Sequence, residues 1–180
     1  MGDVKLTIKG AELKGLQQAK EVLEKYSKAH VKVGVFGGNH SSNGESLAKI
    51  AAEHEFGSIT PKTFNYKGKQ ITINGLPTRS WLRMPLKLKK GQLKGKGYED
   101  KEFFKQVIIK ELENGYTGVA LKFLGKNAEG IIDDAFATEG FGQWKKNISP
   151  EYIELKGSDT PLIDSGELRR SVSSQVVDGR

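Results

Sequence analysis

The residues best suited to acid–base chemistry are carboxylates that occur close together in the chain. They form three pairs: Glu53 with Glu55, Asp133 with Asp134, and Asp164 with Glu167. Two carboxylates can act as general acid and general base when a fold holds them beside one reacting bond. Carboxylates this close in sequence are also typical of a solvated helix face, and nothing in the sequence brings two pairs together. We therefore expect no catalytic residues among them.

Ser165 and Asp164 are expected to have a structural role. Either side chain can cap the helix that the sequence predicts from Gly166 onwards, because a short oxygen-bearing side chain accepts a hydrogen bond from the first free N–H groups of a helix. Ser165 is not a nucleophile of the esterase type, since the pattern Gly-x-Ser-x-Gly is absent around it.

A glycine-containing stretch at residues 31–38 has the outline of a phosphate cradle, a strand followed by glycines and then a helix. Its glycines, Gly34, Gly37 and Gly38, do not have the spacing Gly-x-Gly-x-x-Gly, and no Gly-Lys-Ser/Thr follows. The stretch therefore predicts a strand end and a loop.

Metal and thiol chemistry are disfavoured by composition. The chain of 180 residues has no cysteine, which excludes disulfides and thiolate ligands. Its histidines, His30, His40 and His54, include no pair at the four-residue spacing of a helical zinc site. We expect no metal, no cofactor and no enzymatic activity.

The strongest charge signal is a basic run without an acidic residue between positions 83 and 96. Its members are Arg83, Lys87, Lys89, Lys90, Lys94 and Lys96. Lysines on a flexible segment can neutralise phosphates without reading sequence, so these residues are the candidate DNA contacts. Glycines at 91, 95 and 97 predict a mobile loop over residues 87–97, which would face the lumen of an assembled ring. The alternative is a solvated loop, which the net charge of +7 does not exclude.

The elements that must position these residues follow from hydrophobic periodicity. Period-two alternation predicts strands, and apolar residues at three- and four-residue steps predict helices. The predicted strands cover residues 4–8, 31–36 and 171–177, with a hairpin at 63–73; the predicted helices cover 11–29, 46–55, 99–113, 118–136 and 149–155. The fold class is α+β: a small antiparallel or mixed sheet packed with two long and several short helices, plus the hairpin.

Length and hydropathy complete this outline. We expect a single domain over residues 1–180, with the hairpin at 63–73 and the basic segment at 87–97 as insertions. No stretch approaches the roughly 20 apolar residues of a membrane span, and the first residues lack the form of a signal peptide. A protein made in a reducing cytoplasm, or built into an assembly there, is therefore expected.

Three segments, taken in order, resemble one family. They read Ile-Ala-Ala-Glu-His-Glu-Phe-Gly-Ser at 50–58, Leu-Pro-Thr-Arg-Ser-Trp-Leu-Arg at 76–83, and Pro-Leu-Ile-Asp-Ser-Gly-Glu-Leu-Arg-Arg-Ser at 161–171. In this order they are similar to the virion-morphogenesis and tail-completion proteins of tailed bacteriophages, neck or minor tail components. The likeness extends from about residue 31 to 177. Trp81 stands where the family usually has Phe, and Ser165 where Thr is common.

The resemblance implies a non-enzymatic virion protein at the head–tail junction or tail end, assembled in the host bacterial cytoplasm. Its implied partners are further copies of itself in a ring, with six copies expected, and neighbouring connector, tail-terminator or tail-tube proteins; DNA in the lumen is a further candidate, and no membrane is involved. The motif residues then have structural roles: Glu55, Phe56, Gly57, Pro77, Arg79, Trp81, Leu82, Asp164, Ser165, Gly166, Leu168 and Ser171. Arg79 and Arg83 are expected to point toward Glu53 or Glu55.

A different interpretation stays open. The chain could be a basic nucleic-acid-binding protein that uses the Lys/Arg run at 83–96. Free duplex DNA binding with a steep salt dependence would favour that interpretation, and rings without DNA affinity would favour the neck role.

Overall fold

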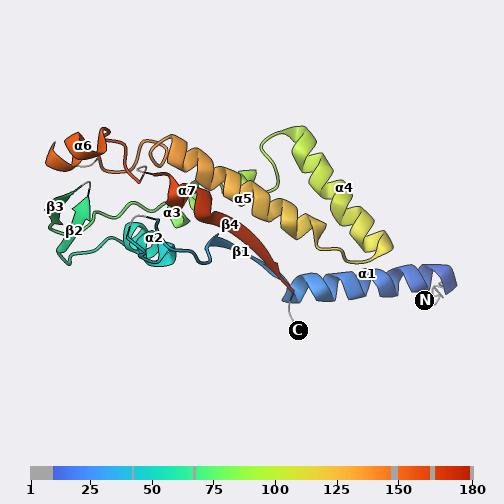
Figure 1. Cartoon of the computed structure of the whole chain (residues 1–180). Helices are drawn as coiled ribbons and strands as arrows, with labels where there is room; N and C mark the ends of the chain where they lie inside the picture. Colours follow the sequence, from blue (N-terminus) through green and yellow to red (C-terminus); the bar gives the residue numbers. More distant parts are fainter. Residues whose placement is uncertain (1–9, 42, 67, 147–149, 163–164, 179–180) are drawn as a thin grey trace, which may run out of the picture.

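The computed structural model describes residues 10–41, 43–66, 68–146, 150–162 and 165–178 (Figure 1). The predicted strand at 4–8 lies outside these residues. In chain order the elements are α1 Gly10–Lys28, β1 His30–Val35, α2 Leu47–Phe56, β2 Lys62–Tyr66, β3 Lys69–Ile73, α3 Arg83–Leu88, η1 Lys90–Gln92, α4 Tyr98–Asn114, α5 Val119–Ala137, α6 Pro150–Lys156, α7 Glu167–Ser171 and β4 Val172–Val177. The predicted α+β class with a small sheet is confirmed.

The strands form two antiparallel pairs, β1 with β4 and β2 with β3. In the first pair, called the β1–β4 ribbon below, Val31 lies opposite Val176 and Val35 opposite Val172. The ribbon runs along α5 (Figure 1). A Cβ on Gly125 of α5 would come within 2.5 Å of the Ser174 hydroxyl oxygen, so glycine allows the helix to lie this close to the ribbon. The predicted hairpin at 63–73 is the β2–β3 pair, with Gly68 at φ +79° in its turn.

The core is built on the C-terminal half of α5. Phe136 is fully buried, and its ring centroid lies 6.1 Å from that of Trp81 and 5.5 Å from that of Trp144. Ala51 of α2 and Leu168 of α7 belong to the same cluster. Aromatic side chains bury a large apolar area each, so two tryptophans and one phenylalanine account for much of the stabilisation of a core this small.

One expectation is wrong in part. The basic segment at 87–97 is not a loop throughout: helix α3 continues to Leu88 and the 3-10 turn η1 follows, and residues 93–97 lack a helix. Helix formation is explained by Met84 and Leu86, which pack against the core and give the segment an apolar face.

The apolar face of the first helix is only partly covered. Val22 is 2% exposed, but Leu13, Leu16 and Leu23 are 58%, 58% and 59% exposed. The leucines are exposed because α1 packs chiefly on α4 and its N-terminal part extends past the rest of the molecule (Figure 1).

Two glycines at helix ends have positive φ, as their positions predict. Gly57 ends α2 at φ +78°, ψ 171°, and Gly166 precedes α7 at φ +74°, ψ 8°. Residues with side chains reach the left-handed region of Gly166 at a modest cost, but the conformation of Gly57 is almost restricted to glycine. A Cβ on Gly57 would also lie 2.8 Å from Thr78 Oγ1 and 3.0 Å from the Leu76 carbonyl oxygen.

We therefore predict that Gly57→Ala lowers the free energy of unfolding by about 3 kcal/mol and Gly166→Ala by about 1 kcal/mol. A Cβ on Gly166 would meet only the flexible end of Arg170, which can move away. Urea denaturation of the two variants beside the unchanged protein measures both values. Equal losses would contradict the backbone argument.

Candidate functional site

The three segments that carry the family resemblance meet in space. The C-terminal end of α2, residues 76–84 and α7 enclose the buried Trp81, and we call this region the motif junction. Trp81 is 3% exposed and shares a cluster with Ala51 of the first segment and Leu168 of the third. Segments more than a hundred positions apart therefore form one packed unit.

Glu55 is the polar centre of the motif junction. The residue is 3% exposed, and its carboxylate accepts hydrogen bonds from Ser80 Oγ at 2.7 Å, Leu82 N at 2.9 Å, Arg83 N at 3.2 Å and Arg83 Nε at 2.8 Å. Leu82 is the N-cap residue of α3 and Arg83 its first residue, so the Glu55 carboxylate accepts hydrogen bonds from free N–H groups at the start of that helix. Burial alone would raise the pKa of the Glu55 carboxyl, but the hydrogen bonds from Arg83, Leu82 and Ser80 bring it below its ordinary value.

The prediction for Arg83 is confirmed and that for Arg79 is wrong. Arg83 pairs with Glu55, and its guanidinium lies 4.5 Å from the ring centroid of Phe56. Arg79 is buried, and its Nε donates to the carbonyl of Lys145 at 2.8 Å. It therefore ties residues 76–84 to the loop that carries Trp144.

Both tryptophans bond across segments through their indole N–H. Trp81 Nε1 donates to the Ala51 carbonyl at 2.8 Å, and Trp144 Nε1 donates to the Ser80 carbonyl at 3.1 Å. Two further bonds join the first and second segments: Arg79 N donates to the His54 carbonyl at 2.8 Å, and the Thr78 hydroxyl donates to the Phe56 carbonyl at 3.1 Å. These four hydrogen bonds hold the segments of the junction together.

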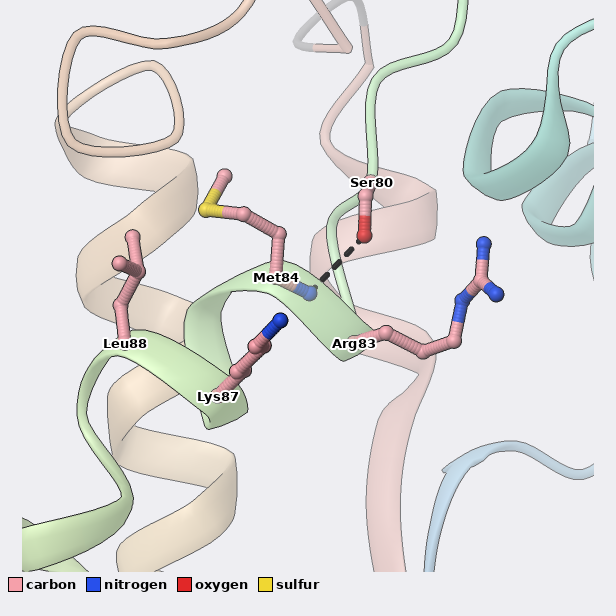
Figure 2. Close-up of a pocket in the computed structure, with 5 residues that line it drawn as sticks. All are labelled: Ser80, Arg83, Met84, Lys87 and Leu88. Carbon is pink, nitrogen blue, oxygen red and sulfur yellow. Dashed lines mark hydrogen bonds between the residues drawn. The ribbon is translucent and has the colours of Figure 1, made fainter.

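Ser80 was not anticipated as a junction residue. Its hydroxyl donates to Glu55 and accepts from Met84 N at 2.9 Å, so it bridges the two helices (Figure 2). With Arg83, Met84, Lys87 and Leu88 it lines an open hollow on α3. Met84 and Leu88 point to one side of α3 in this view and Arg83 to the other (Figure 2). The only sequence signal for Ser80 is its place three residues before the first turn of a helix, a capping position.

The third motif contributes packing at the junction. Leu168 is buried, and Ser171 Oγ donates to its carbonyl at 2.7 Å. Ser165 Oγ accepts from Glu167 N at 3.3 Å, so the expected cap exists, one residue earlier than the N-cap position. Asp164 lies outside the described residues, and Pro77 is half-buried at the entry to the second motif.

The carboxylates that are paired in the sequence bond to different basic partners and do not form a common site. Glu53 pairs with Lys62, and Asp133 takes a two-point bond from Arg169 at 2.5 and 2.7 Å. Within the described ranges, no group of three or more His, Asp or Glu residues could hold a metal ion. None of the described helices combines the length and the apolar character that crossing a bilayer requires.

The six candidate DNA contacts divide into two groups. Arg83 pairs with Glu55, Lys96 pairs with Asp134 at 2.5 Å, and Lys89 lies 4.9 Å from the ring centroid of Phe141. The exposed members for which the described part of the chain supplies no acidic partner are Lys87, Lys90 and Lys94.

A second buried carboxylate, Glu111 of α4, was missed. It accepts from Tyr26 of α1, from Thr117 Oγ1 and from Val119 N at 2.8 Å, and so joins α1, α4 and the start of α5. Burial, followed by the hydrogen bond to Glu111, raises the pKa of the Tyr26 hydroxyl well above its ordinary value. A glutamate eight residues before a helix start is too ordinary a pattern to have suggested this role.

Comparison of the chain with family models, with curated proteins and with solved structures found no match. A proposal for its function therefore depends on the chain's own motifs and on the geometry of the junction that they build.

The first prediction from this site concerns Glu55. Glu55→Gln keeps the shape of the side chain but turns an NH2 group toward donors, so we expect a loss of about 3 kcal/mol in the free energy of unfolding. Arg83→Ala removes one exposed partner and leaves three hydrogen bonds to the carboxylate, so it should cost no more than about 1 kcal/mol. Urea denaturation of both variants tests the order, and a larger loss for Arg83→Ala would show that the ion pair matters more than the cap.

The second concerns His54, whose Nδ1 is buried without a hydrogen-bond partner among the described residues. Burial, aided by the positive charges of Arg79, Lys62 and Lys156, lowers the pKa of His54 to about 4. A depressed folded-state pKa means that stability is complete above about pH 6.5 and is lost as pH falls toward 4, by about 3 kcal/mol in total.

The measurement is the free energy of unfolding of the unchanged protein and of His54→Gln at several pH values from 7 to 4. The carboxylates contribute equally to both profiles, so their difference isolates the histidine. We expect the difference to change by about 2 to 3 kcal/mol over this range, whereas parallel profiles would contradict a buried neutral imidazole.

Proposed function

We propose that this chain is a structural subunit of a tailed-phage virion, a tail-completion or neck component that works in a ring where head and tail join. The observation that carries the proposal is the motif junction. The three segments that resemble the family are distant in sequence and interlock around Trp81. A structural subunit requires residues of this kind, which hold distant segments of its chain together by packing and hydrogen bonds.

The chemistry of the junction supports an architectural role over an enzymatic one. The Glu55 carboxylate accepts four hydrogen bonds and the two tryptophan N–H groups donate to backbone carbonyls. A general acid or base must keep a proton-transfer position open to its substrate, but these groups are occupied within the protein. They fix the relative positions of α2, α3 and α7.

The surface of α1 supports assembly. Leu13, Leu16 and Leu23 are all more than half exposed, and a cluster of exposed apolar side chains marks an interaction surface more often than it occurs by chance. Identical subunits that meet through two different surfaces close into a ring when the rotation between them allows it. Six copies is the number that the family resemblance implies.

Lys87, Lys90 and Lys94 support a role for DNA in the lumen of such a ring, and they also support the second candidate function, a nucleic-acid-binding protein. Their charges are available for phosphates: Lys87 lies in the last turn of α3, Lys90 begins η1 and Lys94 follows η1. The two functions differ in whether DNA binding or the joining of particles is the primary activity.

The test uses a tailed phage that encodes this chain. An early stop codon in the gene should leave DNA packaging and tail assembly intact and cause unjoined heads and tails to accumulate, as counted by electron microscopy. Asp133→Ala, which breaks a surface pair with Arg169, should restore joined particles on complementation. A carboxylate variant that forms joined particles and still abolishes infectivity through a lost chemical step would favour an enzyme instead.

Complementation together with a DNA-binding assay distinguishes the structural role from the nucleic-acid-binding role. Lys87, Lys90 and Lys94 are changed together to Gln, and the matched control changes Lys101, Lys110 and Lys122, three exposed lysines on α4 and α5. For the structural role we expect joined particles with both triple variants. For the nucleic-acid role only the first triple variant should lose duplex DNA affinity. The slope of its log binding constant against log salt concentration should be smaller by about three.

A further inference from the structure

Among the described residues, the contacts that hold helix α1 lie from Gln18 to its C-terminal end. Its C-terminal half is held through Tyr26, which bonds Glu111, and through the buried Val22. The turn that contains Gln18 reaches the last residues of α4 by a bond to the Glu113 carbonyl. Beyond that contact the helix continues toward its N-terminus past the α4–α5 turn (Figure 1), with Leu13 and Leu16 exposed.

The β1–β4 ribbon is unusually small for a sheet that covers a helix. Within the described part of the chain neither strand pairs with a third, so each has an edge of backbone groups available for another strand. Val31, Val33 and Val35 face the core side with Ser174, which bonds Glu129 of α5, and the exposed Lys32 and Gln175 face outward. A two-stranded ribbon gains stability from an added strand with the same alternation.

The sequence offers such a strand immediately before α1. Residues 4–8 read Val-Lys-Leu-Thr-Ile, which alternates apolar and polar positions and predicts a strand. Paired with the ribbon, Val4, Leu6 and Ile8 would continue its valine face, and Lys5 and Thr7 would join the outward polar face. The pattern of the segment thus matches both faces of the ribbon.

Geometry prevents this segment from pairing along its whole length with the ribbon of its own chain. Helix α1 spans Gly10–Lys28, so its two ends lie about 27 Å apart. Ile8 is two residues from Gly10 and so stays within about 8 Å of that end. The ribbon starts at the opposite end of α1 and leads away from it (Figure 1).

We propose that α1 is an exchange arm. In the assembled form the segment at 4–8 adds a strand to the β1–β4 ribbon of a second copy of this chain, and Leu13, Leu16 and Leu23 are covered by that copy. The occupant is a second copy because one sequence supplies both the strand and the edge that matches it, and because the helix holds the two too far apart to combine within one chain. The proposal rests on the ring of the proposed function and names the contact that closes it.

The experiment uses single cysteines, since the chain has none of its own. The full chain carrying Thr7→Cys is mixed with chains carrying Lys32→Cys on β1 or Gln175→Cys on β4, and the mixture is treated with a short bismaleimide. Neighbouring positions on adjacent strands are about 5 to 8 Å apart, so the reagent tolerates a shifted register. Gln106→Cys, exposed on α4, is the matched control.

We expect a cross-linked pair of unlike chains with Lys32→Cys or Gln175→Cys, whichever strand offers the edge, and no product with Gln106→Cys. In the unmodified background, Leu6→Asp should convert the assembled form to monomer in light scattering and leave the thermal midpoint of the monomer unchanged. The exchange arm is overturned if rings form without either cross-link. It is equally overturned if the double variant with Thr7→Cys and Lys32→Cys links within a single monomer.

These outcomes are separate from those of the proposed function. A chain that exchanges arms in solution but is dispensable for joining heads to tails would remove the virion role and leave the exchange intact. A chain that is required for joining heads to tails but shows no cross-link would keep the virion role and overturn the exchange arm.

Discussion

Burial of the Glu55 carboxylate is the constraint on which the motif junction depends. A charge almost removed from water must be matched by donors, and all four of its hydrogen bonds come from residues 80–83. Meeting that requirement fixes the start of α3 against the end of α2. It also sets the short segment between them so that Trp81 is directed into the core, where its indole reaches Ala51. The positions of α7 and of the Trp144 loop follow from that tryptophan, because both pack on the same cluster.

Periodicity was enough to predict most helices and the strands, since an amphipathic pattern reports directly on which side of an element meets the core. It failed where a contact distant in sequence decides the outcome. Residues 83–92 contain a proline, a glycine and four basic residues, all signals of a loop, yet the cap from Glu55 and the apolar Met84 and Leu86 make them helical. The partner of Arg83 could be anticipated from a nearby carboxylate. The bond from Arg79 to the Lys145 carbonyl could not be anticipated, because every residue has a backbone carbonyl and the sequence does not show which one a side chain reaches.

The molecule has two carboxylate-centred joints, one at Glu55 and one at Glu111. Each uses a glutamate to supply hydrogen-bond acceptors at the start of the following helix, α3 in the first case and α5 in the second. The first joint is enclosed by aromatic side chains and resists separation of its parts. The second also holds the C-terminal half of α1 through Tyr26, on the side of the molecule where apolar side chains remain exposed. Buried aromatic side chains are therefore concentrated around the tryptophans, and the exposed apolar side chains of α1 lie toward the other end of α5 (Figure 1).

The pairing of β1 with β4 has a consequence for the order of folding. His30 lies opposite Val177, so the first described strand must wait for the last one before its backbone groups are satisfied. While a ribosome is still making the chain, β1 can have no partner from its own sheet, and loop closure over such a separation is slow compared with the formation of α1 or of the β2–β3 hairpin. Nascent chains on one messenger RNA would thus present unpaired β1 strands to one another for most of their synthesis. A high local concentration of such edges favours mispairing between chains, and slow translation lengthens the interval in which mispairing can occur.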